Sequence, residues 1–234
     1  MPEQPQAVAE RYLKVRQQVV QAALESGRAP DTVLLLAVGK RMPIELLRAA
    51  HDAGARDFGE NYVQEALAKV DGLPLDARWH LIGHLQSNKA KRAVEAFHSI
   101  HTLDRPSLAA ALEKELATRQ AQLEVLLQVN VGGEDSKSGT TPEGAVALAR
   151  RMAEWPHLRL RGLMTIPPYH PDPERTRPQF RALRQLRDQI AALGLPGVEM
   201  HQLSMGMSHD YPVAVQEGAT IVRVGTAIFG ERSP

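Results

Sequence analysis

The sequence predicts an α/β fold, a single parallel (β/α)8 TIM barrel with an extra N-terminal helix, and three observations carry this prediction. Strand-like runs alternate with helix-like segments, and eight βα-like units can be counted along the chain. A length of 234 residues fits one such barrel as well as it fits two ordinary domains. We find no fixed-period repeat, low-complexity tract or linker, so one domain is expected over residues 1–234. A doubly wound open sheet is the alternative fold.

The first helix precedes the barrel proper. Its apolar residues run from Val8 to Ala22 at spacings of three and four, and Gly27 ends it ahead of Pro30. The eight strands are expected, in chain order, at residues 33–38, 57–59, 79–83, 99–102, 125–130, 160–166, 201–204 and 221–224.

The helices between these strands carry start and stop signals. Thr141 can cap a helix whose first turn holds Pro142 and which runs to about Trp155. Gly194 closes a long helix with an apolar stripe at 180–193. The other helices are expected at about residues 43–54 and 61–70, from 87, from 106, and at 212–217. The proline-rich residues 170–178 are interpreted as an exposed connecting loop rather than a gating lid.

Composition excludes several classes of function. The net charge is +1, from 28 basic and 27 acidic residues, which does not favour nucleic-acid binding. Basic clusters at 89–92 and 181–187 fall in helical patterns and are interpreted as solvated faces. Cysteine is absent, and the N-terminus lacks the pattern of a secretory signal. No apolar run approaches the ~20 residues that span a bilayer, so we expect a soluble, cytoplasmic protein without membrane contact.

The nine histidines do not form a recognisable metal motif. His98 and His101 lie three residues apart on an expected strand and therefore point to opposite faces. His-Glu-x-x-His patterns and glycine-rich nucleotide fingerprints are absent from the sequence. We expect no metal site.

The expected barrel brings the carboxyl ends of its strands to one face, where functional residues gather. Six candidates lie at or just beyond such ends: Lys40, Asn61, His80, Met164, Ser204 and Arg223. Lys40 follows the apolar run 33–38 almost directly. In a barrel mouth near Arg223 its ammonium form would be disfavoured, which leaves an amine able to condense with an aldehyde. A surface lysine at a strand end is the alternative reading.

The last two strands carry a phosphate-binding pattern. Barrels often bind phosphate with the loops after strands seven and eight. Gly206 and Gly225 allow close backbone approach, while Ser204, Ser208 and Thr226 can donate hydroxyl hydrogen bonds. Taken alone, the glycines could equally serve only as turn residues. An amine facing a phosphate site indicates a phosphorylated aldehyde as the ligand.

Six motifs spread over nearly the whole chain resemble one known family and make the identification of the ligand more specific. They are Ala37-Val38-Gly39-Lys40, residues 58–65 (FGENYVQE), 79–89 (WHLIGHLQSNK), 136–139 (SKSG), 161–164 (RGLM) and 222–230 (VRVGTAIFG). In this order they resemble the YggS/PROSC family of pyridoxal-phosphate homeostasis proteins. Members of that family are single-domain barrels similar to the N-terminal domain of alanine racemase.

The resemblance implies that Lys40 holds pyridoxal 5′-phosphate (PLP) as an internal aldimine, a Schiff base. It places six residues around the phosphate: Ser204, Gly206, Met207, Ser208, Gly225 and Thr226. Arg223 would face the pyridine nitrogen and disfavour its protonation. Asn61, His80 and Met164 would line the ring. Lys137 is a candidate second amine for transient capture, with a solvated loop lysine as the alternative.

The sequence departs from the family at one position beside the lysine. A serine usually precedes the lysine in this family, and Gly39 stands there instead. We expect binding to survive this change, since the covalent bond and the phosphate contacts should dominate affinity.

The leading functional hypothesis is a non-catalytic carrier that holds PLP and delivers it to PLP-dependent apo-enzymes, with no catalytic residue. The alternative is a PLP-dependent amino-acid racemase, which needs an acid and a base on opposite faces of its substrate. In alanine racemase a second domain and a partner subunit supply one of them, and we expect no such domain here. A Schiff-base aldolase acting on a sugar phosphate is a third possibility. We expect a monomer.

Overall fold

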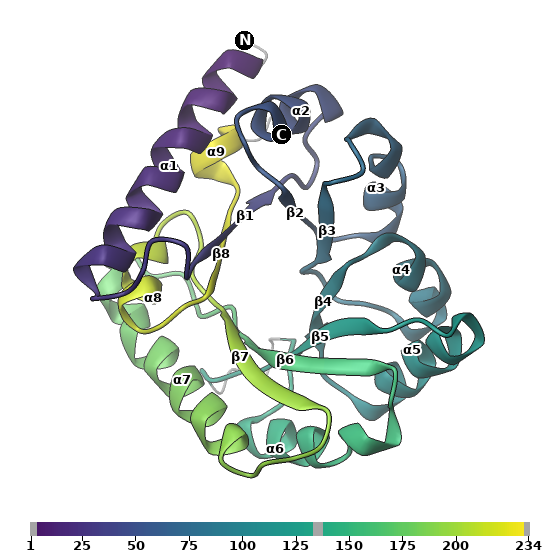
Figure 1. Ribbon diagram of the computed structural model, residues 1–234. Coiled ribbons are helices and arrows are strands. Elements are labelled where there is room, and N and C mark those ends of the chain that lie inside the picture. Colours follow the sequence, from purple (N-terminus) through teal and green to yellow (C-terminus); the bar gives the residue numbers. More distant parts are fainter. Residues whose placement is uncertain (1–3, 133–137, 232–234) are drawn as a thin grey trace.

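The computed structural model describes residues 4–132 and 138–231, and its strands form a closed parallel barrel in the order β1 to β8 (Figure 1). Closure occurs where β1 pairs with β8, with Leu34 opposite Ile221 and Ala37 opposite Val224. The predicted barrel is therefore confirmed, and the open sheet is excluded. The strands are β1 Leu34–Val38, β2 Asp57–Glu60, β3 Arg78–Leu81, β4 Ser99–Leu103, β5 Leu123–Gln128, β6 Leu158–Met164, β7 Val198–Ser204 and β8 Ile221–Val224.

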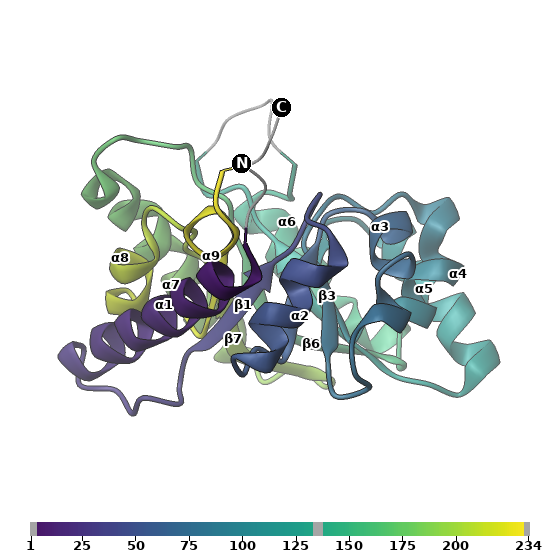
Figure 2. The same cartoon turned by 90° about the horizontal axis from the view of Figure 1, so that it is seen from above.

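Helices surround the strands on all sides, as Figures 1 and 2 show. The additional helix α1 (Pro5–Glu25) lies outside the barrel and packs against α2, α8 and α9. The remaining α-helices are α2 Ile44–Asp52, α3 Val63–Leu67, α4 Ala90–Ala96, α5 Pro106–Arg119, α6 Pro142–Arg150, α7 Arg177–Ala191, α8 Tyr211–Gln216 and α9 Thr226–Phe229. Short 3₁₀ turns occur at η1 Val70–Gly72, η2 Ser87–Lys89, η3 Met152–Glu154 and η4 Pro173–Thr176.

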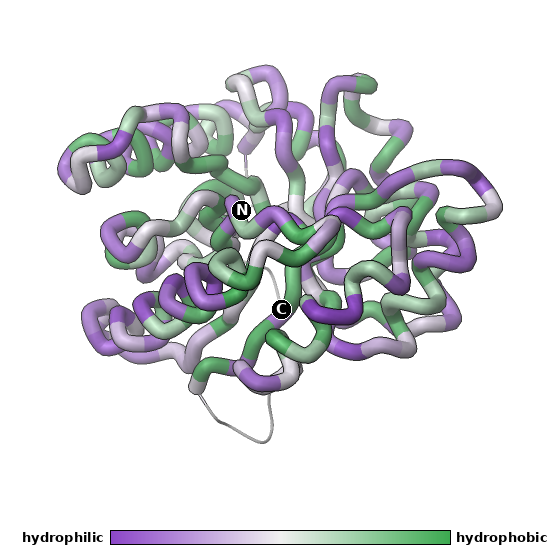
Figure 3. The backbone as a smooth tube through the Cα atoms, turned by 60° about the horizontal axis from the view of Figure 1, so that its bottom comes forward, coloured by the Kyte–Doolittle hydropathy of each residue, from purple (hydrophilic) through white to green (hydrophobic). Residues whose placement is uncertain are grey.

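The main hydrophobic core lies between the barrel and the helices. Hydrophobic and hydrophilic stretches alternate along these helices (Figure 3), as expected when one face of each helix is buried. A second, smaller apolar cluster consists of Leu36, Val38, Ile82, Leu126, Met164 and Ile221, one or two residues from each of several strands. Because barrel interiors are normally filled by such branched side chains in layers, this cluster is the apolar part of the barrel interior.

Two helices end earlier than the sequence predicted. The Thr141 cap is confirmed, because its Oγ1 accepts a hydrogen bond from the Gly144 amide at 3.1 Å. However, α6 ends at Arg150, and the chain tightens into η3 instead of continuing to Trp155. Arg151 forms two hydrogen bonds with Glu154 across this turn. Their spacing of three residues matches the period of a 3₁₀ turn.

Helix α3 is also shorter than the predicted span of residues 61–70 and stops at Leu67. Lys69, just beyond it, directs its side chain inward, where Nζ donates to Glu60 Oε1 at 2.7 Å. The turn after α3 thus supplies a buried hydrogen bond to the last residue of β2.

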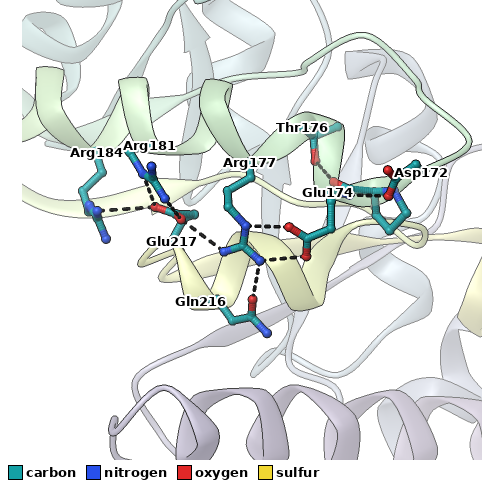
Figure 4. Close-up of polar contacts among 9 residues, drawn as sticks. Asp172, Glu174, Thr176, Arg177, Arg181, Arg184, Gln216 and Glu217 are labelled. Carbon is teal, nitrogen blue, oxygen red and sulfur yellow. Dashed lines mark hydrogen bonds and ion pairs between the residues drawn. The ribbon is translucent and has the colours of Figure 1, made fainter.

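The basic run in α7 is partly engaged in a salt-bridge network rather than wholly solvated (Figure 4). The carboxylate of Glu217 is buried and accepts hydrogen bonds from Arg177 at 3.1 Å and from Arg181 at 2.9 Å. Arg184 approaches it within 3.4 Å. Burial alone would raise the pKa of Glu217, but these hydrogen bonds outweigh it and lower the pKa. The network ties α7 to the end of α8.

Candidate functional site

A cavity of about 250 Å³ opens at the carboxyl ends of the barrel strands. It receives side chains from the ends of β1, β3 and β8 and from the loops after β2, β6 and β7. Its lining residues are Val38, Lys40, Asn61, Ile82, Ile166, Tyr169, Met207, Ser208, His209, Arg223, Gly225 and Thr226. The lining combines an amine, a guanidinium and three hydroxyl-bearing side chains, so this is the face where the sequence predicted a site.

The backbone on both sides of Lys40 is held by side chains from the next βα unit. Lys69 Nζ donates to the Gly39 carbonyl at 2.9 Å, and Glu65 Oε2 accepts from the Arg41 amide at 3.1 Å. Arg41 adopts φ of 61°, a left-handed conformation that costs free energy for a residue other than glycine. These contacts therefore fix the turn that presents the half-buried Lys40 to the cavity.

Gly39, where the resembling family usually has serine, sits against the side chain of Leu47. A Cβ built at Gly39 would lie 2.9 Å from Leu47 Cδ2, closer than such contacts normally are. Glycine therefore suits this chain, because the leucine side chain occupies the space that a serine would need.

Arg223 forms a fixed positive wall of the cavity. Its side chain is only 3% exposed, and it donates to Ser204 Oγ and to the Thr165 carbonyl, each at 2.8 Å. Burial lowers the pKa of Arg223 to about 10, while the neighbouring Asp210 carboxylate opposes that shift. The guanidinium therefore stays protonated at neutral pH.

The loops after β7 and β8 meet at Ser208. Its Oγ accepts from the Gly225 amide at 3.2 Å and from the Ala227 amide at 3.3 Å. Gly206, two residues earlier, has φ of +91°, and a Cβ there would lie 2.6 Å from Ala214 Cβ. The position thus requires glycine both for its conformation and for its close packing.

The structure brings seven of the eleven predicted binding residues to the cavity wall: Lys40, Asn61, Met207, Ser208, Arg223, Gly225 and Thr226. The other four are not among its lining residues. Met164 belongs to the apolar interior cluster, and Gly206 shapes the loop below, where its carbonyl accepts from the Arg223 amide. His80 and Ser204 lie in the barrel interior, where they hydrogen bond to other buried side chains.

Five lining residues were not identified from the sequence: Val38, Ile82, Ile166, Tyr169 and His209. The rings of Tyr169 and His209 lie 5.2 Å apart, and His209 Nε2 is within 3.0 Å of the Pro171 carbonyl. The loop interpreted as a simple connection therefore contacts the cavity rim. Ile82 could have been found from the alternation along β3, because it shares the inward face of His80 and lies closer to the carboxyl end.

A second cavity, of about 510 Å³, lies at the opposite mouth, between α1 and the starts of the first three strands. Arginines 16, 56 and 78 line it, but no amine does. Within residues 4–132 and 138–231, no cluster of side chains is arranged to hold a metal ion. None of the helices in these two segments is both long and apolar enough to cross a membrane. Lys137 lies outside the described residues.

Comparison with known proteins gives consistent matches. The family model described as alanine racemase, N-terminal domain, matches residues 26–233. The pyridoxal phosphate homeostasis protein of Pseudomonas aeruginosa is 48% identical over 228 residues, covering 96% of each chain. That of Aquifex aeolicus is 44% identical over 224 residues, covering 95% of this chain and 97% of the relative. The structure of PipY from Synechococcus elongatus with PLP bound has 37% identity and a TM-score of 0.82, and the match covers 95% of this chain and all of PipY.

Proposed function

The chain belongs to the family of pyridoxal phosphate homeostasis proteins and matches the alanine racemase N-terminal domain, and we propose that it binds PLP in the Lys40 cavity and holds it for delivery. The observation that carries this proposal is the convergence of Lys40, Arg223, Ser208 and Thr226 on one small cavity. The barrel and the family were both predicted from the sequence, and both are confirmed.

The chemistry of the lining fits PLP. Lys40 offers an amine for the aldehyde carbon. The hydroxyl of Ser208, whose oxygen accepts from the Gly225 and Ala227 amides, and the hydroxyl of Thr226 offer donors for a phosphate. Ile82 and Ile166 supply the apolar surface that an aromatic ring needs. We propose that these residues hold the cofactor.

Bound PLP supplies an electrophilic carbonyl carbon and a pyridine ring that can accept electrons. Arg223 determines how far the second property is used. It is a cation at neutral pH, it donates through both terminal nitrogens, and it is buried, so it disfavours protonation of a base beside it. A ring facing Arg223 is therefore a weaker electron acceptor than one facing a carboxylate, which favours holding the cofactor over catalysis with it.

We propose accordingly that the protein is a non-catalytic carrier, and the racemase alternative is not favoured. The relatives are named as homeostasis proteins. We also propose that the carrier acts as a single-domain monomer and that its recipients are PLP-dependent apo-enzymes.

The test is the absorption spectrum of protein purified with PLP. The wild type is expected to be yellow, and Lys40→Ala is expected to lose the band. The matched control is Lys114→Ala, an exposed lysine on α5, which should keep it. Retention of the band by Lys40→Ala would refute the assignment of Lys40. Sustained conversion of L-alanine or L-serine into the D-isomer by the loaded protein would refute the carrier proposal.

A further inference from the structure

A continuous chain of hydrogen bonds crosses the barrel interior from one mouth to the other. It starts at Asp57, the first residue of β2, whose Oδ1 lies 2.9 Å from His80 Nε2. His80 Nδ1 lies 3.1 Å from His101 Nε2, and His101 Nδ1 lies 3.0 Å from Ser204 Oγ. Ser204 Oγ then accepts from Arg223 Nη1 at 2.8 Å. All five side chains are buried.

The two ends of this relay border different cavities. Asp57 and His80 line a cavity of about 370 Å³ at the amino-terminal ends of the strands, whereas Arg223 lines the Lys40 cavity. A barrel interior is normally filled by apolar side chains, so a polar column of this length is unusual. Each group in it has to be satisfied, because an unpaired polar atom in the interior is costly.

The hydrogen-bonding capacities of the groups give the relay one direction. Ionised Asp57 can only accept, so His80 Nε2 must donate to it. In a neutral His80, Nδ1 then accepts from His101 Nε2, which leaves His101 Nδ1 as an acceptor. The hydroxyl of Ser204 donates to that nitrogen, and its oxygen remains available to the guanidinium of Arg223.

The opposite direction is less favourable. It requires an extra proton on His80, and it makes both His101 and Arg223 donate to Ser204. The hydroxyl hydrogen of Ser204 would then lack an acceptor among the contacts formed by the described residues. In the favoured direction every hydrogen points from the cation at Arg223 toward the anion at Asp57, so the dipoles reinforce one another.

The protonation states of Asp57 and His101 agree with this direction of the relay. Burial would raise the pKa of Asp57, but hydrogen bonds from His80 and from Arg78 outweigh it and lower the pKa. The two bonds from Arg78 measure 2.8 and 2.7 Å. Burial holds the pKa of His101 well below its ordinary value, with the charge of Arg223 acting in the same direction, and the ring is therefore neutral.

We propose that Asp57, His80 and His101 are positioning residues for Arg223, acting through a directional hydrogen-bond relay that fixes the Ser204 oxygen toward the guanidinium. Both histidines are neutral Nε2–H tautomers in this arrangement. A carboxylate at one mouth of the barrel thereby determines the orientation of a cationic group at the other. The consequence for PLP rests on the proposed function, whereas the relay itself does not.

The direct test is ¹⁵N NMR of the histidine rings in the protein without cofactor. In the wild type, His80 and His101 are expected to show protonated Nε2 and unprotonated Nδ1. In Asp57→Asn, the His101 resonances should shift although Asp57 and His101 are not in contact. The matched control is Asp76→Asn, whose carboxylate lies 2.8 Å from His51 Nε2 and outside the relay. It should change the signals of His51 and leave those of His101 in place.

Two results would overturn the relay: an Nδ1–H or cationic His101 in the wild type, or His101 signals that ignore Asp57→Asn. Should that variant fold poorly, His101→Asn and His101→Phe serve instead. The side-chain oxygen of asparagine can still accept from Ser204 near the position of Nδ1, whereas phenylalanine cannot. His101→Asn should therefore retain PLP better than His101→Phe, and equal PLP retention by the two variants contradicts the proposal.

A second experiment measures PLP retention and the absorption maximum of the protein loaded with PLP. Asp57→Asn is expected to weaken retention about 10-fold, the lower end of the effect that outer hydrogen-bond partners have at metal sites, and to shift the maximum. Asp76→Asn should do neither. Unchanged retention and an unchanged maximum in Asp57→Asn contradict the positioning role. Failure of the wild type to bind PLP would refute the proposed function, and the NMR result would still decide the relay.

Discussion

Glu60 provides a prediction whose size can be worked out from the structure. It ends β2 with a side chain 0% exposed, and its Oε1 accepts from Lys69 at 2.7 Å. Burial raises the pKa of Glu60 from 4.5 to about 7, against the lowering effect of the Lys69 ammonium. The folded protein therefore holds a proton on Glu60 at pH values where the unfolded chain has released it. This contribution to stability is complete below about pH 4.5 and is lost as the pH rises through about 7.

The raised pKa corresponds to about 3 kcal/mol of unfolding free energy, at about 1.4 kcal/mol per pKa unit. Glu60→Gln is uncharged and should remove this dependence. Relative to the wild type, the variant should gain about 3 kcal/mol between pH 4.5 and 8. Urea denaturation, followed through the buried tryptophans Trp79 and Trp155, measures the difference. Glu45→Gln, at an exposed position of α2, is the control and should keep the wild-type pH profile. Parallel curves for wild type and Glu60→Gln would refute the reasoning.

The other predictions concern the loops and the salt-bridge network. Gly206→Ala should lower the unfolding free energy by about 3 kcal/mol, from backbone strain and overpacking. Gly27→Ala, where a Cβ meets nothing within 4 Å, should cost only about 1 kcal/mol, and equal losses in urea would contradict the packing argument. Glu217→Gln should lower the stability by about 2 kcal/mol, because the hydrogen bonds to arginine lose their charge. An unchanged Tm would show that the network is not stabilising. Ser208→Ala should weaken PLP retention about 10-fold, and unchanged affinity would exclude this serine from the phosphate site.

The barrel could be predicted from the sequence because its signals are local. Most strands contain apolar residues within a short run, and the longer helices have an apolar stripe; one helix also has a recognisable cap, Thr141. Lys40 and the loops after β7 and β8 could be placed for the same reason, since they directly follow identifiable strands. The order of the elements then brings them together without further information.

Depth within the barrel could not be predicted in this way. His80 faces inward, as expected, but Ile82, just beyond the end of the same strand, lies nearer the mouth and takes the position at the cavity. Ser204 is likewise one layer too deep, so its hydroxyl meets Arg223 and His101. Strand alternation shows which face a side chain takes, whereas depth depends on the stagger between neighbouring strands, which the sequence of one strand does not contain. The pairing of Tyr169 with His209 joins two loops and has no local signal at all.

The central claim is that Lys40 holds PLP covalently, and reductive trapping tests it most directly. The protein is loaded with PLP, reduced with borohydride, digested and mapped by mass spectrometry. We expect the modification on the peptide that contains Lys40, at about one per chain, and its absence from Lys40→Ala. Modification spread over exposed lysines, or an equal yield in Lys40→Ala, would contradict the claim.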